Sequence, residues 1–280
     1  MRLPAIWSCV WRPAPNRRPN MPVDLDVLVI AERSAIRHVQ LDELSESDEM
    51  GKDARTVFEA YKPTTLTFDC YGTLIDWQSG ACRALRDIYG YSESTATDDD
   101  LIDLFLQYDA RIIREHIFPY SKVLQRVAQS VAKRLGVKSN FDLEVSFAGT
   151  LPSWPPFEET NTCLTQLARH YRLAVISNID EKLLCQTIRQ LPVPFEALVT
   201  SEQTRCYKPD RAIFERAIEM IGERPSRIVH IAEGRCEATP VHALGMRCVW
   251  VNRSQRSDDG SNANPDAVVA NLTEIIKATS

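Results

Sequence analysis

No uninterrupted apolar run in this sequence reaches about 20 residues, the length that a transmembrane helix needs. The chain also lacks a C-x-x-C pair, an internal repeat and a low-complexity tract. Its eight cysteines have no regular spacing, which favours free thiols in a reducing compartment, the cytoplasm, over a disulfide framework. The formal net charge of −5 argues against nucleic acid and against an anionic membrane as partners.

The remaining composition is ordinary for a globular protein, with 44% hydrophobic and 25% charged residues. A chain of 280 residues can bury the core of one α/β domain together with a smaller inserted domain. Cys70 and Cys206 lie close to the motifs described below, but neighbouring residues have clearer roles, so we expect no catalytic cysteine.

Residues 1–60 differ from the rest of the chain. The first 20 residues contain four arginines, four prolines and no acidic residue, and residues 41–53 are acidic and polar. This composition predicts a disordered leader, or translation from an upstream start with Met21 or Met50 as the natural initiator. A transit peptide is the alternative, and we assign no function to the region.

From Thr64 onward, short β-rich runs alternate with helical patterns, which predicts βα units and a parallel sheet. The expected strands cover 65–68, 173–177, 197–200, 228–231 and 247–251, and a last short strand and a terminal helix share residues 265–278. The fold class is therefore α/β, with a Rossmann-like doubly wound sheet.

A long helical stretch, residues 80–157, separates the first two expected strands. Its apolar residues recur at intervals of three and four, whereas a crossover between parallel strands needs only about a dozen residues. We therefore expect a helical cap over 80–154, inserted into a catalytic core formed by 61–79 and 155–280. The prolines of LPSWPPF mark the expected return to the core.

The segment LTFDCYGTLIDW, residues 66–77, carries the strongest chemical signal. An apolar strand leads directly into Asp69, followed by a glycine turn at Gly72 and a hydroxyl at Thr73. Ligands of open α/β sheets bind at the carboxyl ends of strands, so Asp69 is well placed to act as a nucleophile. An isolated D-x-x-G is more often a turn or a helix cap, and further motifs are needed to decide.

Three further motifs follow at later strand ends: Ser177-Asn178, Lys208-Pro209 and the segment HIAEGRCEA. With DCYGTL, they resemble the four motifs of the haloacid dehalogenase superfamily, in the same order. The resemblance covers about residues 64–253. It implies the α/β core, the inserted cap and a hydrolase that forms a covalent intermediate on its aspartate.

Tyr71 decides which branch of the superfamily the chain resembles. The phosphatases usually have a second aspartate two residues after the nucleophile, which protonates the leaving oxygen. The sequence here is D-x-Y-G-T, as in the 2-haloacid dehalogenases, whose halide leaves without a proton. The resemblance therefore implies a small-molecule substrate with a carbon–halogen bond.

The resemblance also implies roles for individual residues. Asp69 attacks the halogen-bearing carbon, and Lys208 keeps Asp69 ionised and oriented. Thr73 and Ser177 hold the nucleophile or the substrate carboxylate by hydrogen bonds.

In the same scheme the amide of Asn178 stabilises the departing halide, and Glu237 activates the water that hydrolyses the ester. Glu237 as a simple first-turn helix acid is an equally weighted alternative. The dehalogenase motif usually reads Ser-x-Asn-x-x-Asp, and the matching positions here are Ala232, Gly234 and Glu237.

Substrate contacts are expected from Tyr71 and Trp77, and Trp154 flanks the second connection to the cap. The family's cap supplies an arginine for the halide or carboxylate. Arg111 and Arg114 lie on the corresponding helix of this chain and are both named as candidates.

Dehalogenases of this type work without a metal, so no cofactor is expected. If Mg²⁺ is bound, Asp69 and Glu233 would hold it through oxygen ligands. The first rival function is accordingly a Mg²⁺-dependent phosphatase or phosphonatase that uses the same aspartate. The second rival is a small-anion binder that has lost catalysis. The oligomeric state stays open, with a homodimer as one option.

Overall fold

The computed structural model describes residues 53–115, 119–255 and 261–280. The expectations for residues 1–52, Met21 and Met50 among them, lie outside the described residues. Helix α1, Ala54–Tyr61, occupies the end of the predicted disordered leader, so that prediction extended too far along the chain. Val57 and Phe58 are buried on one face of α1, which packs against the C-terminal helix and so gains the tertiary contacts that a short helix needs.

Six parallel strands form a single sheet in the order β3-β2-β1-β4-β5-β6, which confirms the predicted doubly wound α/β fold. The strands are β1 Thr65–Phe68, β2 Arg172–Ser177, β3 Ala197–Thr200, β4 Ile228–Ala232, β5 Arg247–Val251 and β6 Ala267–Val269. Because the strand order reverses between β1 and β4, a crevice opens at their carboxyl ends.

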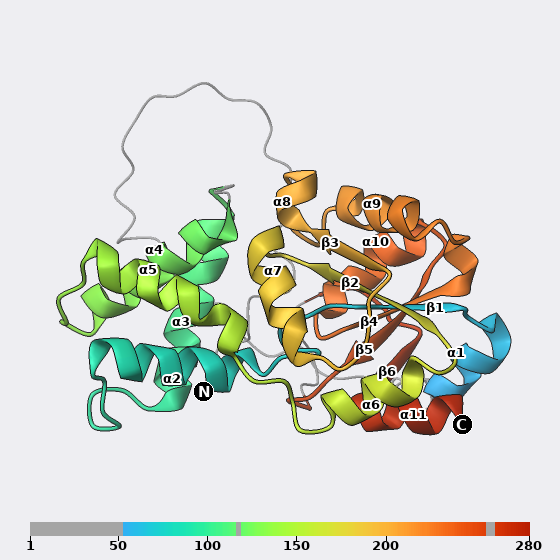
Figure 1. The fold of residues 1–280 in the computed structure, drawn as a ribbon, viewed down its shortest axis with the longest axis horizontal. Helices are drawn as coiled ribbons and strands as arrows, with labels where there is room; N and C mark the ends of the chain where they lie inside the picture. Colours follow the sequence, from blue (N-terminus) through green and yellow to red (C-terminus); the bar gives the residue numbers. More distant parts are fainter. Residues whose placement is uncertain (1–52, 116–118, 256–260) are drawn as a thin grey trace, which may run out of the picture. The chain divides into compact units, whose positions relative to one another are not determined.

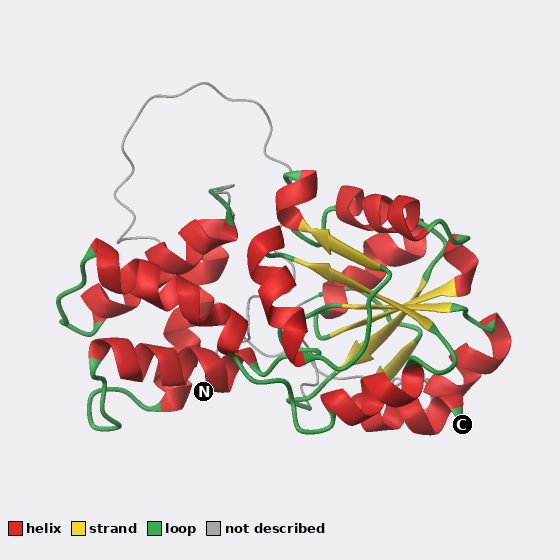
Figure 2. Cartoon of the chain, viewed as in Figure 1, coloured by secondary structure: helices red, strands yellow, loops and turns green. Residues whose placement is uncertain are grey.

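Helices lie on both faces of the sheet (Figure 1), and Figure 2 separates them by type from the strands that they cover. After α1 the helices are α2 Trp77–Tyr89, α3 Asp98–Ile113, α4 Tyr120–Arg134, α5 Phe141–Thr150, η2 Leu151–Ser153, α6 Thr160–Leu167, α7 Glu181–Thr187, η3 Ile188–Gln190, α8 Ser201–Thr204, α9 Arg211–Ile221, η4 Pro225–Arg227, η5 Arg235–Glu237, α10 Ala238–Ala243 and α11 Leu272–Thr279.

Two apolar clusters fill the two faces of the sheet. On β2, Leu173 and Val175 belong to the cluster that includes α1, α6 and α11, and Ala174 and Ile176 belong to the cluster under α9 and α10. Since both faces are covered, β2 is a continuous apolar run from Leu173 to Ile176 rather than an alternating one. Each fully buried aliphatic side chain of this kind contributes about 1.5–3 kcal/mol.

Four helices, α2 to α5, fill most of the connection between β1 and β2. Helix α3 begins with a capping box, in which the Thr97 hydroxyl accepts from Asp100 N and the Asp100 carboxylate accepts from Thr97 N. The outgoing and returning chains pair side by side, with Asp76 N bonded to Pro155 O at 2.8 Å. The division into a core and a cap over 80–154 stays a prediction.

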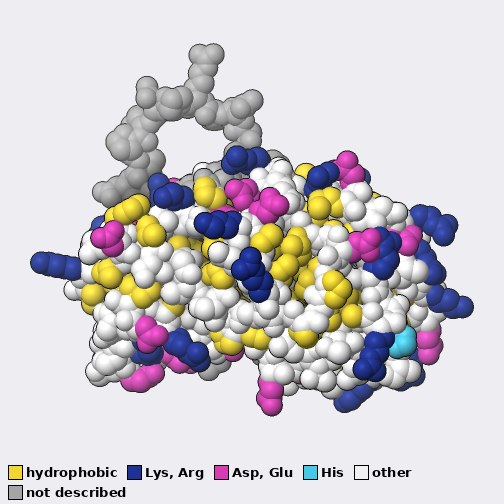
Figure 3. All heavy atoms as spheres, in the orientation of Figure 1, with side chains coloured by type: hydrophobic (Ala, Val, Ile, Leu, Met, Phe, Trp, Pro, Cys, Tyr) yellow, Lys and Arg dark blue, Asp and Glu magenta, His cyan; other side chains and the backbone are white. Residues whose placement is uncertain are grey.

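The described surface carries charges of both signs, and Figure 3 shows them interspersed with apolar patches on one face. None of the described helices combines the length and the apolar content that crossing a bilayer would require.

Candidate active site

The turn after β1 positions Asp69 at the carboxyl end of the central strand. Gly72 adopts a φ of 98°, a region that glycine enters without steric cost, and the chain turns sharply there. Thr73 Oγ1 donates to Asp69 Oδ2 at 3.0 Å and accepts from Glu233 N at 2.9 Å. The Thr73 hydroxyl therefore orients the carboxylate, as the sequence predicted for this position.

Lys208 reaches Asp69 from the segment that precedes α9. Its Nζ lies 2.6 Å from Asp69 Oδ1 and 3.0 Å from Glu237 Oε2. Only 4% of the Lys208 side chain is exposed, so water does little to screen these charges. The structure thus brings together three residues that are up to 168 positions apart in the sequence, at the point where the crevice opens.

The pKa values in this cluster follow from burial and from one positive charge shared by two negative ones. Burial raises the pKa of Asp69; Lys208 opposes that effect and the negative Glu237 adds to it, so the net direction is upward. Burial also disfavours the charged form of Glu237, but attraction to Lys208 and the hydrogen bond with His230 outweigh it and lower the pKa. Burial disfavours the Lys208 ammonium, but the two carboxylates raise its pKa, and it stays charged.

Ser177 is the last residue of β2, and Asn178 follows it beside this cluster. Asn178 Oδ1 accepts from Lys208 N at 2.6 Å, and its Nδ2 donates to Lys208 O at 3.3 Å. Asn178 therefore fixes the backbone of Lys208, a contact that sequence reasoning did not anticipate. An amide NH₂ has two hydrogens, so a second donor remains on Nδ2.

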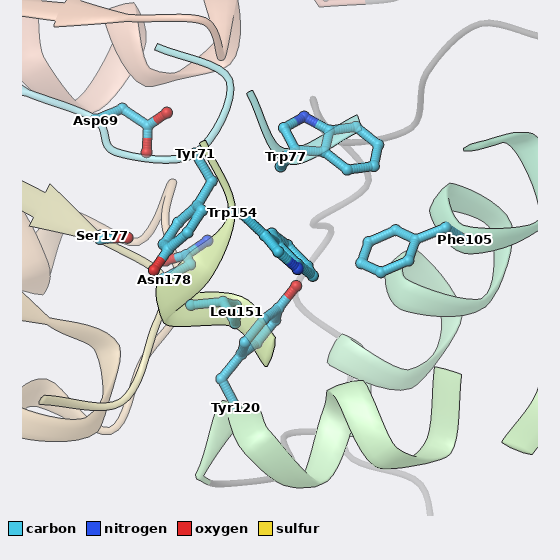
Figure 4. Close-up of a pocket in the computed structure, with 9 residues that line it drawn as sticks. All are labelled: Asp69, Tyr71, Trp77, Phe105, Tyr120, Leu151, Trp154, Ser177 and Asn178. Atoms are coloured by element: carbon cyan, nitrogen blue, oxygen red, sulfur yellow. The ribbon is translucent and has the colours of Figure 1, made fainter. Parts of the chain in front are cut away.

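Two neighbouring cavities border Asp69, with empty volumes of about 360 and 340 Å³ including their open mouths. The first is mostly aromatic, and Figure 4 shows its side chains arriving from the sheet side and from the inserted helices. Its lining residues are Asp69, Tyr71, Trp77, Phe105, Tyr120, Leu151, Trp154, Ser177 and Asn178. The second is polar and is lined by Asp69, Tyr71, Asn178, Lys208, Glu233, Gly234, Cys236 and Glu237.

Tyr71 and Trp77, the expected substrate contacts, line the aromatic cavity. The Tyr71 hydroxyl is 2.7 Å from Thr187 Oγ1, and the Trp77 ring packs against Phe105 with centroids 5.2 Å apart. Tyr120, which the sequence did not single out, lies on the same wall and donates its hydroxyl to Asp109 Oδ1 at 2.7 Å.

Arg111 and Arg114 do not reach either cavity, so neither provides the expected substrate contact there. Both are exposed, and the Arg111 guanidinium lies 5.5 Å from the centroid of the Tyr108 ring. The buried face of α3 carries Phe105 and Asp109, four residues apart, and the helical period of 3.6 turns both arginines to the other side. No arginine borders the two cavities within the described part of the chain.

Asp69 and Glu233 line the polar cavity together and are the residues that would hold Mg²⁺ there through oxygen ligands. The ammonium of Lys208 contacts Asp69 in the same cavity. No cluster of three or more His, Cys, Asp or Glu side chains suited to a metal ion occurs within 53–115, 119–255 and 261–280.

The cysteines near the motifs are poor nucleophiles. Burial raises the pKa of the Cys70 thiol well above its usual range, and the charge of Asp69 adds to the effect. Burial also raises the pKa of Cys206. Because only a thiolate attacks efficiently, these two thiols are chemically quiet.

Sequence reasoning missed two supporting residues. The motif resemblance implies no role for His230, yet its Nε2 lies 2.9 Å from Glu237 Oε2. Arg253 Nη2 donates to Thr73 O at 2.8 Å and so holds the turn that carries Asp69. The spacing of residues along the sequence does not predict either contact, because each contact joins segments that meet only in the folded chain.

Comparison with known proteins gives a consistent result. The sequence model of the haloacid dehalogenase-like hydrolase family matches residues 63–232. The (S)-2-haloacid dehalogenase of Pseudomonas putida is 22% identical over 214 residues, which are 75% of this chain and 93% of that protein.

Solved structures share the fold at lower identity. An L-2-haloacid dehalogenase from Xanthobacter autotrophicus with chloropropionic acid covalently bound has a TM-score of 0.68 and 17% identity, over 78% of this chain and 98% of that one. The magnesium-bound HAD-hydrolase YfnB from Bacillus subtilis has a TM-score of 0.66 and 18% identity, over 77% and 97% of the two chains.

Proposed function

Because this chain belongs to the haloacid dehalogenase-like hydrolase family, we propose that it cleaves the carbon–halogen bond of a 2-haloacid through an ester on Asp69. The observation that carries the proposal is the ion pair of 2.6 Å between Lys208 Nζ and Asp69 Oδ1 on the cavity wall. An ammonium at that distance keeps a buried carboxylate ionised, which an attacking oxygen requires.

In the first step an Asp69 carboxylate oxygen bonds to the halogen-bearing carbon while the carbon–halogen bond breaks, and the halide leaves with the bonding electrons. Thr73 orients the nucleophile through its hydrogen bond of 3.0 Å. Ser177 faces the aromatic cavity, where its hydroxyl can bind the substrate carboxylate. The second N–H of Asn178 stabilises the charge that develops on the halide.

In the second step a water oxygen adds to the ester carbonyl carbon, and Glu237 takes one of the water protons. The bond between that carbon and the substrate oxygen then breaks, and the departing 2-hydroxyacid takes the proton from Glu237. Asp69 releases its remaining proton to solvent and is a carboxylate again. The position of Glu237 on the wall of the polar cavity that Asp69 also lines supports this role.

Mass spectrometry of the Asp69 peptide after turnover of 2-chloropropionate in ¹⁸O-water tests the ester. Label is expected to enter Asp69 over repeated turnovers, because each hydrolysis leaves one water oxygen on the carboxylate. The isosteric variant Asp69→Asn should release no halide. Label confined to the product over many turnovers would contradict the covalent route.

A Mg²⁺-dependent phosphatase or phosphonatase remains the second candidate, because Asp69 and Glu233 line the same cavity. Tyr71 argues against it, since a phosphatase benefits from an acid at that position to protonate the leaving oxygen. Halide release from 2-chloropropionate that is insensitive to EDTA supports the dehalogenase. EDTA-sensitive phosphate release from p-nitrophenyl phosphate supports the phosphatase, and no turnover of either supports a small-anion binder.

A further inference from the structure

His230 is a polar ring in the middle of the sheet. It is fully buried on β4, between Thr67 of β1 and Cys248 of β5 in the strand register. Its Nδ1 lies 2.8 Å from Thr67 Oγ1 and its Nε2 lies 2.9 Å from Glu237 Oε2. Both ring nitrogens are therefore satisfied, which a buried imidazole needs in order not to destabilise the fold.

Glu237 is confined between His230 and Lys208. Both of its oxygens lie near Lys208 Nζ, Oε1 at 3.1 Å and Oε2 at 3.0 Å, and Oε2 also meets the imidazole. A Cβ at Gly234 would lie 2.7 Å from Oε1, so only a residue without a side chain leaves this carboxylate its place beside the polar cavity. The orientation of Glu237 thus depends on contacts at both oxygens.

The Thr67 hydroxyl leaves the Nε2 hydrogen of the ring to Glu237. A hydroxyl can donate to Nδ1, and the ring hydrogen then lies on Nε2 and points at Oε2 of the carboxylate, which can only accept.

The other groups facing the ring do not compete for this role. Phe214 of α9 presents its ring with centroids 5.4 Å apart. Burial raises the pKa of the Cys248 thiol on β5 well above its usual range, so that neighbour is uncharged. Lys208, and Asp69 beyond it, act on His230 only through Glu237.

We propose that His230 is a positioning residue for Glu237. Its Nε2–H holds Oε2 and keeps the carboxylate ionised, so that Oε1 faces the cavity and takes the proton from the hydrolytic water. The inference rests on the proposed function, and it concerns the second step alone. Attack by Asp69 on the substrate does not depend on it.

A pair of variants separates positioning from a merely structural role. In His230→Asn the amide can replace Nδ1 but is too short to reach Glu237, whereas the longer amide of His230→Gln can donate to Oε2. With 2-chloropropionate under single-turnover conditions, H230N should form the ester at the wild-type rate and hydrolyse it about tenfold more slowly or worse. H230Q should recover part of that loss.

His242→Asn is the matched control. His242 Nε2 also contacts a carboxylate, Asp266 Oδ2 at 2.6 Å, but lies on α10 and borders neither cavity. In H242N the ester on Asp69 should form and decay at wild-type rates, as measured by intact mass in quenched samples. Equal ester decay in H230N and the wild type would overturn the proposal, as would equal slowing in H230N and H230Q.

A second measurement needs no substrate. The carboxyl carbon of Glu237, followed by ¹³C NMR, should titrate with a pKa below the ordinary value in the wild type and with a higher pKa in H230N. An unchanged pKa in H230N overturns the proposal. A wild-type protein that forms no ester refutes the proposed function instead, and the titration still decides whether His230 controls Glu237.

Discussion

Lys208 carries one positive charge between two buried carboxylates, and this imbalance sets the acid–base behaviour of the site. The pKa of Asp69 is raised by burial and by Glu237, while Lys208 opposes the rise. A raised pKa means that the nucleophile loses its charge on acidification sooner than an exposed aspartate would. The rate of the ester-forming step should therefore begin to fall at a higher pH than the ordinary carboxyl pKa of about 4 suggests.

Glu237→Gln and Lys208→Met should move this acid limb in opposite directions. Removing the negative charge of Glu237 lowers the pKa of Asp69, so the burst of halide release should persist to lower pH. Removing Lys208 raises that pKa further, and the burst rate at pH 7 should also fall by about 10²-fold or more. Rapid-quench halide assays across pH measure both shifts. If the acid limbs of the two pH–rate profiles coincide, Asp69 and Glu237 do not share the charge of Lys208 in the way described.

The sequence predicted one site for the six proposed catalytic residues, because each lies at or after the carboxyl end of a strand, and these ends share one edge of the sheet. The sequence could not identify the residues that orient these side chains. His230 and Asn178 contact Glu237 and the Lys208 backbone through side chains whose direction depends on the packing of other strands and loops.

At the scale of secondary-structure elements, helix α4 receives its N-terminal cap from another segment. The Asp180 carboxylate accepts from the backbone N–H groups of Tyr120 and Ser121, although Asp180 directly precedes another helix, α7. The side chain makes no cap hydrogen bond to α7. Asp180 therefore ties the loop after β2 to the helix that brings Tyr120 to the aromatic cavity.

Asp180→Ala should cost about 1–2 kcal/mol of unfolding free energy, because two N–H groups at the helix terminus lose their acceptor. We also expect a lower kcat/KM, since Tyr120 is no longer held at the cavity wall. Urea unfolding and steady-state halide release measure the two effects. Each carboxylate oxygen accepts one of the two N–H groups, so Asp180→Asn keeps one acceptor and should lose less stability than Asp180→Ala. No loss in Asp180→Ala would argue against the capping role.

Asp109 links α3 to Tyr120, and burial raises its pKa to about 7, partly offset by the Tyr120 hydrogen bond. The folded state therefore favours the protonated form more than the unfolded state does. The contribution of this group to stability is fully present below the unfolded value of about 4 and is lost as the pH rises through about 7.

Asp109→Asn should remove this pH dependence, because an amide keeps an acceptor for Tyr120 and does not ionise. At 1.36 kcal/mol for each pKa unit, the variant should gain up to about 4 kcal/mol over the wild type between pH 4 and pH 8. Urea unfolding of both proteins at several pH values tests this difference. Parallel stability profiles would show that Asp109 titrates alike in both states.

At the scale of the whole molecule, Arg253 joins three distant segments. It follows β5 and donates to Gly72 O and Thr73 O on the nucleophile turn, and to Glu159 Oε1 on the chain returning from the inserted helices. Its guanidinium also lies 3.6 Å from the centroid of the Phe157 ring. A planar fork with five donors suits this set, and a lysine does not.

Arg253→Lys should lower the unfolding free energy by about 1–3 kcal/mol, because buried carbonyl oxygens lose donors. It should also lower kcat, since the turn that carries Asp69 is less well held. The control is Arg216→Lys on the exposed pair with Glu219, where we expect a change below about 0.5 kcal/mol. Equal effects in urea unfolding would dismiss a special role for Arg253.

The sequence alone determined the strands, their parallel arrangement and the placement of Asp69, Thr73 and Lys208. The physical reason is that a strand appears as a local apolar run, and each of these residues follows such a run along the chain. Only the tertiary structure decided that Arg111 and Arg114 face away from the cavities. Rotation about a helix axis is set by which neighbours its apolar face buries, and those neighbours come from distant parts of the chain.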